Sequence, residues 1–308
     1  MPIAVPVLRA PSRALLVAVA LALGACHPAH EEARRLAAAC EGGDARACHG
    51  LARRLEQGDH ILRDEARAAA LHTRACDRRL GDGCASLAVQ LQEGRGVTRD
   101  TARAVALLAQ GCDRGGMDGC TRLGVLHLTA AIGVPRDPAR AAALFERACT
   151  GGQPLGCARL GIQLGRGEGV AEDLPRAVRL LTAACDATVQ TGCRGLAQLR
   201  HAGRGVARDD SLAIALYTRA CTENELDACM ELGMLHEAGD GTPQDYTAAR
   251  ERYAAACDAG HGESCWRWSL MHERGMGGRR NPERAQELRQ AACRNGYAPA
   301  CPPKSRST

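Results

Sequence analysis

Cysteine recurs along this chain at a fixed interval, and that interval constrains the fold more than any other feature of the sequence. Of the 17 cysteines, 16 form pairs eight positions apart. The pairs recur every 36 residues, with one interval of 37 between Cys112 and Cys149. A period between about 20 and 50 residues is typical of proteins built from stacked supersecondary repeats. The pairs are Cys40 with Cys48, Cys76 with Cys84, Cys112 with Cys120, Cys149 with Cys157, Cys185 with Cys193, Cys221 with Cys229, Cys257 with Cys265, and Cys293 with Cys301.

A disulfide within each pair requires the chain to turn between the two cysteines. Eight residues of a straight helix rise about 12 Å, whereas the Cα atoms of a disulfide lie within about 7 Å. Glycines such as Gly81 and Gly83 stand between the cysteines of most pairs. We therefore expect each bridge to join the end of one repeat to the start of the next. Zinc binding is the alternative, but two ligands do not fill a tetrahedral site.

The segments between the pairs show helical periodicity. After Cys84, the residues Leu87, Ala88 and Leu91 follow the i+3, i+4, i+7 spacing of one helical face. The motif Gly94-Arg95-Gly96 ends this helix, because glycine adopts positive φ without strain. An acid or amide N-cap then begins a second helix in every segment. These N-caps are Asp64, Asp100, Asp137, Asp173, Asp209, Asp245 and Asn281.

The second helix of each segment carries its own apolar face. Alanine stands eight residues before the closing cysteine, as at Ala104, and a large residue usually stands four before it, as at Leu108 and Phe145. We therefore predict an all-α fold of about seven 36-residue helix–turn–helix repeats, with one disulfide at each repeat junction. The segment Glu31 to Cys40 reads as a lone second helix before the first repeat.

The remaining cysteine, Cys26, has a different context. Arg9 and Arg13 precede an unbroken run of 12 small and apolar residues, Ala14 to Ala25, which has the parts of a secretory signal. The run is too short for a membrane-spanning helix, which needs about 20 residues. The sequence Leu-Gly-Ala-Cys that ends at Cys26 resembles the bacterial lipoprotein box, in which the cysteine is lipidated and becomes the new N-terminus. An ordinary cleaved signal is the alternative.

These features divide the chain into four parts. Residues 1–25 are interpreted as a lipoprotein signal peptide, 26–39 as the lipidated cysteine with a short tether and N-terminal cap, 40–301 as the repeat array and 302–308 as a tail. Several acyl chains anchor a protein stably, so we expect the mature chain on the periplasmic face or surface of a bacterial membrane. Secretion without a lipid is the alternative.

Composition excludes several classes of function. The net charge of +5 is small and evenly spread, which argues against a nucleic-acid partner. The single lysine is Lys304 in the tail, so no internal lysine is available as a nucleophile, a base or a phosphate ligand. Aromatic residues make up 2% of the chain, so each helix buries little area and we expect the disulfides to compensate for a thin core.

The repeat itself resembles a known family. The pattern Cys-x-x-Leu-Gly-x-Leu-x-x-x-Gly-x-Gly-Val, followed by Asp and then Ala-x-x-x-large-x-x-Ala-Cys, resembles Sel-like repeats, which are relatives of tetratricopeptide repeats. The cysteine pair in each unit is similar to the Hcp-type, cysteine-rich branch of secreted bacterial proteins. The resemblance covers residues 40 to 301. Two departures stand out: His127, His236 and His272 replace the tyrosine of the family, and the third unit has one extra residue near Ala130.

The resemblance implies both a fold and a role. The family forms a right-handed α/α superhelix with one disulfide per hairpin and usually serves as a scaffold for protein complexes. By this resemblance the chain binds an unidentified protein or peptide on a concave face and has no catalysis of its own. Some Hcp-type members are penicillin-binding proteins with weak β-lactamase activity. The alternative function is therefore a hydrolase acting on β-lactams or peptidoglycan fragments.

No catalytic or cofactor motif was found in the sequence. A serine β-lactamase needs Ser-x-x-Lys, and no serine here has a lysine three residues later. His236-Glu237 and His272-Glu273 are fragments of a zinc motif that lacks its second histidine, and their helical position predicts packing. The Gly-x-Gly motifs follow helices once per repeat, which indicates turns and not a dinucleotide site. We expect neither a cofactor nor a metal ion.

Two further positions are open to a binding role. His27 and His30 stand beside Cys26 and are interpreted as part of a solvated tether, with metal binding as the alternative. Trp268 takes the buried third position after Cys265, so we expect Trp266 near the surface of the last complete repeat. Tryptophan is enriched in the residues that dominate binding energy, which makes Trp266 a candidate partner contact. Packing against the C-terminal segment is the alternative.

Overall fold

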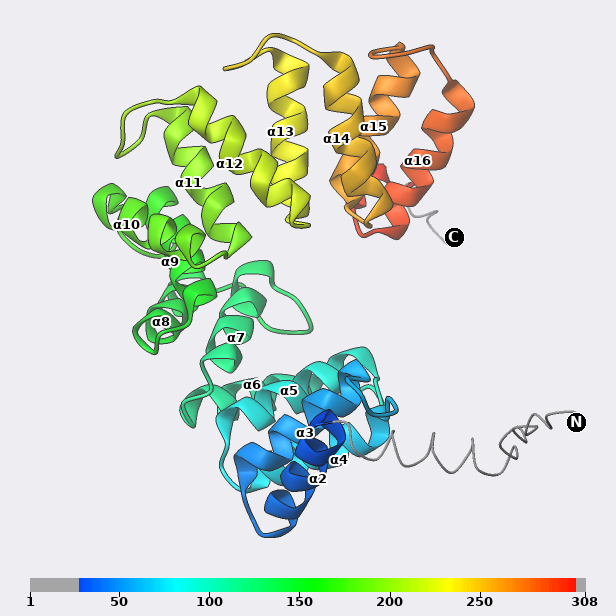
Figure 1. Cartoon of the computed structure of the whole chain (residues 1–308). Coiled ribbons are helices and arrows are strands. Elements are labelled where there is room, and N and C mark those ends of the chain that lie inside the picture. Colours follow the sequence, from blue (N-terminus) through cyan, green and yellow to red (C-terminus); the bar gives the residue numbers. More distant parts are fainter. Residues whose placement is uncertain (1–27, 303–308) are drawn as a thin grey trace, which may run out of the picture. The chain divides into compact units, whose positions relative to one another are not determined.

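The computed structural model describes residues 28–302, which form helices and contain no β-strand. These residues form 15 α-helices (Figure 1) and a short 3₁₀ helix, η1 (Ala298–Ala300). The helices are α2 (Pro28–Glu41), α3 (Ala45–Gln57), α4 (Glu65–Asp77), α5 (Gly81–Glu93), α6 (Thr101–Asp113), α7 (Met117–Thr129), α8 (Pro138–Thr150), α9 (Pro154–Arg166), α10 (Leu174–Asp186), α11 (Gln190–Ala202), α12 (Asp210–Thr222), α13 (Leu226–Ala238), α14 (Tyr246–Asp258), α15 (Gly262–Arg274) and α16 (Pro282–Arg294).

The helices after α2 form seven hairpins, one per repeat. We call α3, α5, α7, α9, α11, α13 and α15 the first helices and α4, α6, α8, α10, α12, α14 and α16 the second helices. The prediction of an all-helical repeat fold with a disulfide at each junction is confirmed. The lone helix before the first repeat begins at Pro28, so most of the stretch assigned to a tether or cap is helical.

Local sequence explains where each helix begins and ends. Asp100 caps α6 and accepts a hydrogen bond of 2.9 Å from the backbone N–H of Arg103. Gly94 ends α5 in the left-handed region, with φ 73°. In the third repeat, where the turn is one residue longer, Ala130 and Ile132 take positive φ values of 53° and 55°. The inserted residue is thus absorbed in the turn and not in a helix.

In five of the repeats, a glycine in the turn lies very close to the repeat before it, whereas in the third repeat a Cβ atom on Gly133 would meet no atom within 4 Å. A Cβ atom on Gly96 would lie 2.2 Å from the backbone oxygen of Glu65, the first residue of the preceding second helix. Only glycine permits this approach at that backbone conformation. The same contact recurs in later repeats: Gly169 on Pro138, Gly205 on Leu174, Gly241 on Asp210 and Gly277 on Tyr246.

Disulfides connect the same neighbours covalently. Seven bridges join the end of a second helix, or of α2, to the segment that opens the following repeat, the eighth joins α16 to Cys301 after η1, and Cα separations lie between 4.4 and 4.8 Å. Between α6 and α7, for example, Cys112 is bonded to Cys120 with a Cα separation of 4.6 Å. Both of these cysteines are buried, with 1% of Cys112 and 0% of Cys120 exposed.

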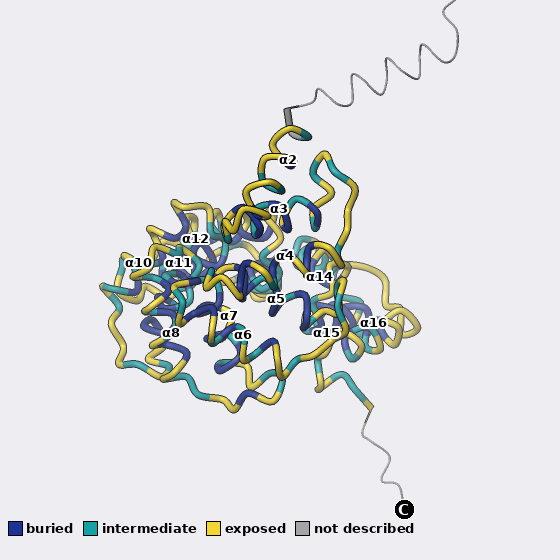
Figure 2. The backbone as a smooth tube through the Cα atoms, turned by 90° about the horizontal axis from the view of Figure 1, so that it is seen from below, coloured by how far each residue is buried: buried dark blue, intermediate teal, exposed yellow. Residues whose placement is uncertain are grey.

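The core between the helices is made of small and large residues in alternation. Ala104 and Leu108 of α6 are fully buried, and so are Ala141 and Phe145 of α8. Figure 2 shows how buried and exposed positions alternate along the helices. Each helix therefore buries one face and leaves the other to solvent.

The chain divides into two compact units, Met1–Leu123 (unit 1) and Gly124–Thr308 (unit 2). The boundary lies inside α7, so the described part of unit 1 includes α2 to α6, and unit 2 includes α8 to α16. Among the described helices, none has the length and apolar character needed to cross a membrane. Cys26 and the apolar run before it lie outside the described residues.

Candidate functional site

Trp266, the contact residue considered from the sequence, is half-buried on α15. Its ring lies 6.2 Å from the ring of Tyr297, centroid to centroid, in the segment that follows α16. Trp268 is 9% exposed, and the guanidinium of Arg284 lies 5.3 Å above its ring. Trp266 therefore packs on the C-terminal segment with part of its surface open.

The three histidines that replace the family tyrosine lie along the helix faces. His127 and His272 are buried, with 6% and 8% of their surface exposed, and His236 is half-buried. Neither ring nitrogen of His272 has a hydrogen-bond partner. Within residues 28–302, no group of three His, Cys, Asp or Glu side chains is arranged to hold a metal ion.

A polar cluster absent from the sequence-based predictions lies on three successive first helices of unit 2. Its centre is Arg194 of α11, which is 5% exposed. Its Nε donates to Glu225 Oε1 at 3.0 Å and its Nη1 donates to Glu231 Oε1 at 3.2 Å. Burial lowers the pKa of Arg194, but Glu231, Asp227 and Glu225 together outweigh burial and raise it. The guanidinium is therefore held charged and in one position.

Glu231 connects this arginine to two more side chains. The amide of Gln198 donates to Glu231 Oε1 at 2.6 Å. Burial raises the pKa of Glu231 above its ordinary value, although Arg194 opposes the shift. Burial and the neighbouring Glu231 carboxylate also raise the pKa of Tyr217, so its hydroxyl stays protonated. Tyr217 thus adds α12, a second helix, to a cluster whose other members lie on first helices.

A further series of hydrogen bonds, centred on His261, extends the cluster to α15. His261 Nε2 lies 3.2 Å from Asp227 Oδ1, and His261 Nδ1 lies 2.7 Å from Ser264 Oγ. The hydrogen bond with His261 lowers the pKa of Asp227, and the charge of Arg194 adds to the shift, while burial opposes it. Serine, histidine and carboxylate in series are the groups of hydrolase triads. Ser264 is fully buried, however, and His261 accepts from its backbone N–H as the N-cap of α15.

Next to the cluster, Arg159 of α9 is a cation without a matching anion in direct contact. It is half-buried, and no other described residue forms a hydrogen bond or ion pair with it. Burial lowers the pKa of Arg159, and the more distant charge of Glu225 offsets this only in part. The Nε of Arg159 is buried without a hydrogen-bond partner, which is unfavourable for a polar group.

A groove of about 280 Å³ lies between α9 and α11. Gly161, Gly165 and Gly195 line it, and Leu181 packs so closely that a Cβ atom on Gly161 or Gly195 would lie 2.8 or 2.6 Å from its side chain. Arg166 and Gln198 line its edge. Since Gln198 also binds Glu231, the groove adjoins the polar cluster. We call the groove, Arg159 and the cluster around Arg194 the first-helix surface of unit 2.

Unit 1 has a separate groove at its N-terminal end, with a volume of about 1090 Å³. It lies between α2, α3 and the turn before α4, and is lined by apolar residues such as Leu51 and Leu55. His60 stands in this turn where later repeats have the second turn glycine. The side chain of Leu62 in the same turn is 92% exposed. This end of the array is therefore less tightly covered than the later repeats.

The sequence did carry a signal for the polar cluster. Arg159 and Arg194 stand two residues and one residue after Cys157 and Cys193, on helices whose other inward positions are apolar, and Glu231 stands two residues after Cys229. Charges of opposite sign at similar positions of successive repeats indicate pairing between neighbours. Apolar periodicity alone does not reveal these positions, because charged residues occupy them.

Comparisons with known proteins agree with this architecture. The Sel1 repeat model matches seven segments: 45–79, 81–116, 118–153, 154–189, 191–225, 226–261 and 262–297. None of the curated proteins compared with the chain matches it.

Several solved structures resemble the chain. One is a protective antigen of uropathogenic Escherichia coli with an SLR fold (25% identity, TM-score 0.55, 87% of this chain and 57% of that chain). The chain thus spans little more than half the length of that antigen. A Sel1 repeat protein from Oxalobacter formigenes has 24% identity and a TM-score of 0.55, over 87% of this chain and 77% of its own. Helicobacter pylori cysteine rich protein B has 25% identity and a TM-score of 0.36, over 42% of this chain and 93% of its own.

Proposed function

Since the chain belongs to the Sel1 repeat family, we propose that it is an extracytoplasmic scaffold that binds another protein across the first-helix surface of unit 2. Sel1 repeats are used for protein–protein interaction. The eight disulfides indicate an oxidising compartment outside the cytoplasm, because thiols in the cytosol are kept reduced.

The observation that carries the proposal is the unpaired Arg159 beside an open groove. Structural ion pairs elsewhere on this surface are complete, as Arg194 with Glu225 and Glu231 shows. The Nε of Arg159 is buried without a hydrogen-bond partner, and burial lowers the pKa of Arg159. The groove floored by Gly161 and Gly165 offers apolar surface next to it. An extended segment with an apolar side chain and a nearby carboxylate complements both features.

Replacing Arg159 with glutamine tests the proposal. The variant removes the charge that the partner carboxylate would meet, while nothing in the described residues depends on an Arg159 ion pair. Charged hydrogen bonds contribute about 1.5–3 kcal/mol, so we expect partner affinity to fall by roughly one to two orders of magnitude. Crosslinking in cells that export the chain, followed by identification and titration of the captured protein, gives the measurement.

Arg179→Gln is the matched control for this experiment. Arg179 is exposed on α10, a second helix, and its replacement removes the same charge. The control is expected to capture the partner like the unmodified chain. Equal capture by all three proteins, with helical content unchanged, would remove the first-helix surface of unit 2 as the binding site.

We further propose that Cys26 is lipidated and anchors the mature chain to a membrane. The support is the sequence around Cys26 and its position as the one cysteine outside the eight pairs. Mass spectrometry of the mature N-terminus is expected to find an acylated Cys26, and Cys26→Ala is expected to move the protein from the detergent phase to the aqueous phase. An unmodified N-terminus downstream of residue 26 would instead indicate a secreted protein.

The hydrolase alternative rests on one observation, the hydrogen-bonded series of Ser264, His261 and Asp227. Hydrolysis would require Ser264 to become exposed, because its hydroxyl is fully buried in this structure. We expect no turnover of nitrocefin by the purified mature chain. Turnover that Ser264→Ala abolishes would establish the hydrolase instead, whereas turnover that this variant retains would point to a nucleophile elsewhere.

A further inference from the structure

The eight disulfides differ in how well the protein covers them. In six bridges both cysteines are buried, and the most exposed of these twelve residues, Cys221, is 9% exposed. The two half-exposed bridges are Cys149–Cys157 and Cys293–Cys301. Cys293–Cys301 closes the end of the repeat array, where no further repeat follows. Cys149–Cys157 lies inside the array, between α8 and α9, and its exposure needs another explanation.

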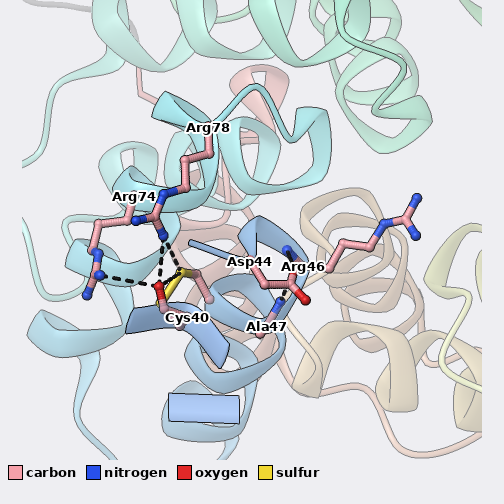
Figure 3. The surroundings of a disulfide bond; sticks show 7 residues. Cys40, Asp44, Arg46, Ala47, Arg74 and Arg78 are labelled. Atoms are coloured by element: carbon pink, nitrogen blue, oxygen red, sulfur yellow. Dashed lines mark hydrogen bonds between the residues drawn. A yellow bond between two sulfur atoms is a disulfide. The ribbon is translucent and has the colours of Figure 1, made fainter. Parts of the chain in front are cut away.

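One layer of cover comes from the following repeat. Around the first bridge, Arg78 Nη1 donates to the carbonyl oxygen of Cys40 at 2.9 Å and approaches Cys48 Sγ at 3.4 Å, and Arg74 also reaches the Cys40 oxygen (Figure 3). Arg114 covers the second bridge in the same way, with Cys84 Sγ at 3.5 Å. At the two corresponding positions over Cys149–Cys157 stand Ala183 and Ala187. Their side chains are too short to reach the bridge.

We take the side chains of the loop between the two cysteines as a second layer of cover. In the loop of Cys149–Cys157, Gly151 and Gly152 follow directly after α8 and carry no side chain. Most other loops have at least one side chain there, such as Glu223 and Asn224 in the loop of Cys221–Cys229.

Two other bridges show that losing one layer is not enough. The loop of Cys40–Cys48 also has paired glycines, Gly42 and Gly43, but the arginine cover is present and the cysteines are 1% and 0% exposed. The bridge Cys221–Cys229 lacks a long covering side chain, because Ala255 and Ala259 stand at the two positions. Its loop side chains are present, and its cysteines are 9% and 2% exposed. Among the seven bridges that have a following repeat, Cys149–Cys157 lacks both layers.

From this comparison we infer that Cys149–Cys157 is the thiol–disulfide exchange site of the folded protein, where a dithiol reagent or a dithiol oxidoreductase opens the repeat array. Exchange depends on access of a thiolate to a disulfide sulfur. The attacking thiolate forms a bond to one cysteine Sγ, the Cys149–Cys157 bond breaks, and the other cysteine leaves as a thiolate that takes up a proton. The second thiol of the dithiol then displaces the mixed disulfide, which releases a reduced pair and leaves the dithiol oxidised.

Exchange at this bridge would also act on the proposed binding surface. Arg159 stands two residues after Cys157 on α9, so breaking the bridge removes the covalent link between α8 and the start of the helix that carries Arg159. This consequence rests on the proposed function. The exchange reaction does not, because it is measured on the cysteines themselves.

Stepwise reduction of the full oxidised chain tests the inference. The folded protein is treated with increasing dithiothreitol, free thiols are alkylated at each step, and the alkylated cysteines are identified by mass spectrometry. We expect Cys149 and Cys157, with the terminal Cys293 and Cys301, to be labelled while the other six bridges remain intact. Labelling of Cys221 and Cys229 at the same or lower reductant concentration would overturn the inference, since that bridge lacks only one layer of cover.

Two variants then test the cause of the exposure in opposite directions. Ala187→Arg supplies the side chain that Arg78 provides over Cys40–Cys48 and is expected to delay labelling of Cys149 and Cys157. Arg78→Ala removes cover above the Gly42–Gly43 loop and is expected to bring Cys40 and Cys48 into the early-labelled group. Far-UV circular dichroism of the oxidised variants verifies the fold. Unchanged labelling order in both folded variants would contradict the account.

Discussion

At the scale of single residues, one helical position shows that the repeat tolerates a side chain whose burial is energetically unfavourable. Seven residues after the first-helix cysteine, Leu91 and Leu164 pack as buried leucines, whereas the last repeat has His272. Neither nitrogen of the His272 ring has a hydrogen-bond partner. Burial lowers the pKa of His272 below its ordinary value of 6.5, and the charges of Arg250 and Arg284 lower it further. The ring is therefore kept neutral by its surroundings.

His272→Leu is expected to stabilise the last repeat and to reduce the pH dependence of unfolding. In the unmodified chain, the pKa of His272 is lower in the folded state than in the unfolded state, so the unfolded state takes up a proton at a higher pH. This residue therefore makes stability fall as the pH drops below 6.5, by at most about 1.4 kcal/mol per pH unit. Urea unfolding of both proteins from pH 7.5 to 5.5 measures the difference. A stability difference between the two that does not change over this range would contradict the prediction.

At the scale of elements, the turn between the two helices of a repeat acts as a contact with the preceding repeat. Gly96 places its Cα against the start of α4, and Gly169 does the same on α8. The helices would form without this contact, because their caps and apolar faces are local. The close packing of one hairpin on the next depends on it.

Gly96→Ala is expected to be more destabilising than Gly115→Ala. Both glycines have positive φ, 67° and 81°, which costs alanine roughly 1–2 kcal/mol. A Cβ on Gly96 would also collide with backbone atoms of Glu65 and Ala66, whereas a Cβ on Gly115 would meet no atom within 4 Å. Urea unfolding of the two oxidised variants separates the steric effect from the conformational one. Equal losses of unfolding free energy in the two variants would mean that the turn at Gly96 does not pack closely against α4.

At the scale of the whole chain, stability accumulates from contacts between neighbouring repeats. Such arrays are described approximately by the stability of each repeat plus the interaction with its neighbour. Here α2 and α3, α4 and α5, α8 and α9, α10 and α11, α12 and α13, and α14 and α15 are in contact, and a disulfide bridges each of these junctions. A bridge that closes so short a loop contributes about 2–3 kcal/mol by the chain-entropy estimate.

Removing one buried bridge measures that contribution. The double variant Cys185→Ser, Cys193→Ser is expected to lose about 2–3 kcal/mol of unfolding free energy while keeping its helical content. Chemical denaturation followed by circular dichroism provides the number. A loss near zero would show that the helix contacts alone hold α10 against α11.

The sequence predicts the fold far better than it predicts the binding surface. Apolar residues stand at fixed distances from cysteine in each repeat, as Ala104, Leu108 and Phe145 show. This period can be recognised from the sequence without knowledge of any contact. The cluster around Arg194 depends on which charges of neighbouring repeats meet, and Arg159 is notable only because no anion lies against it. Exposure of Cys149–Cys157 likewise depends on side chains 34 and 38 positions after Cys149. Such relations between repeats become visible only in the packed structure.

The eight short covalent rings have a consequence for proteolysis in a protease-rich environment. A cut between Cys40 and Cys48 opens the backbone, but the disulfide keeps both fragments in one molecule. A cut in a glycine turn such as 94–99 divides the chain into two pieces, because no bridge crosses that turn. Nicked molecules that stay whole without reductant and fall apart with it would therefore map the cleavage to the repeat junctions.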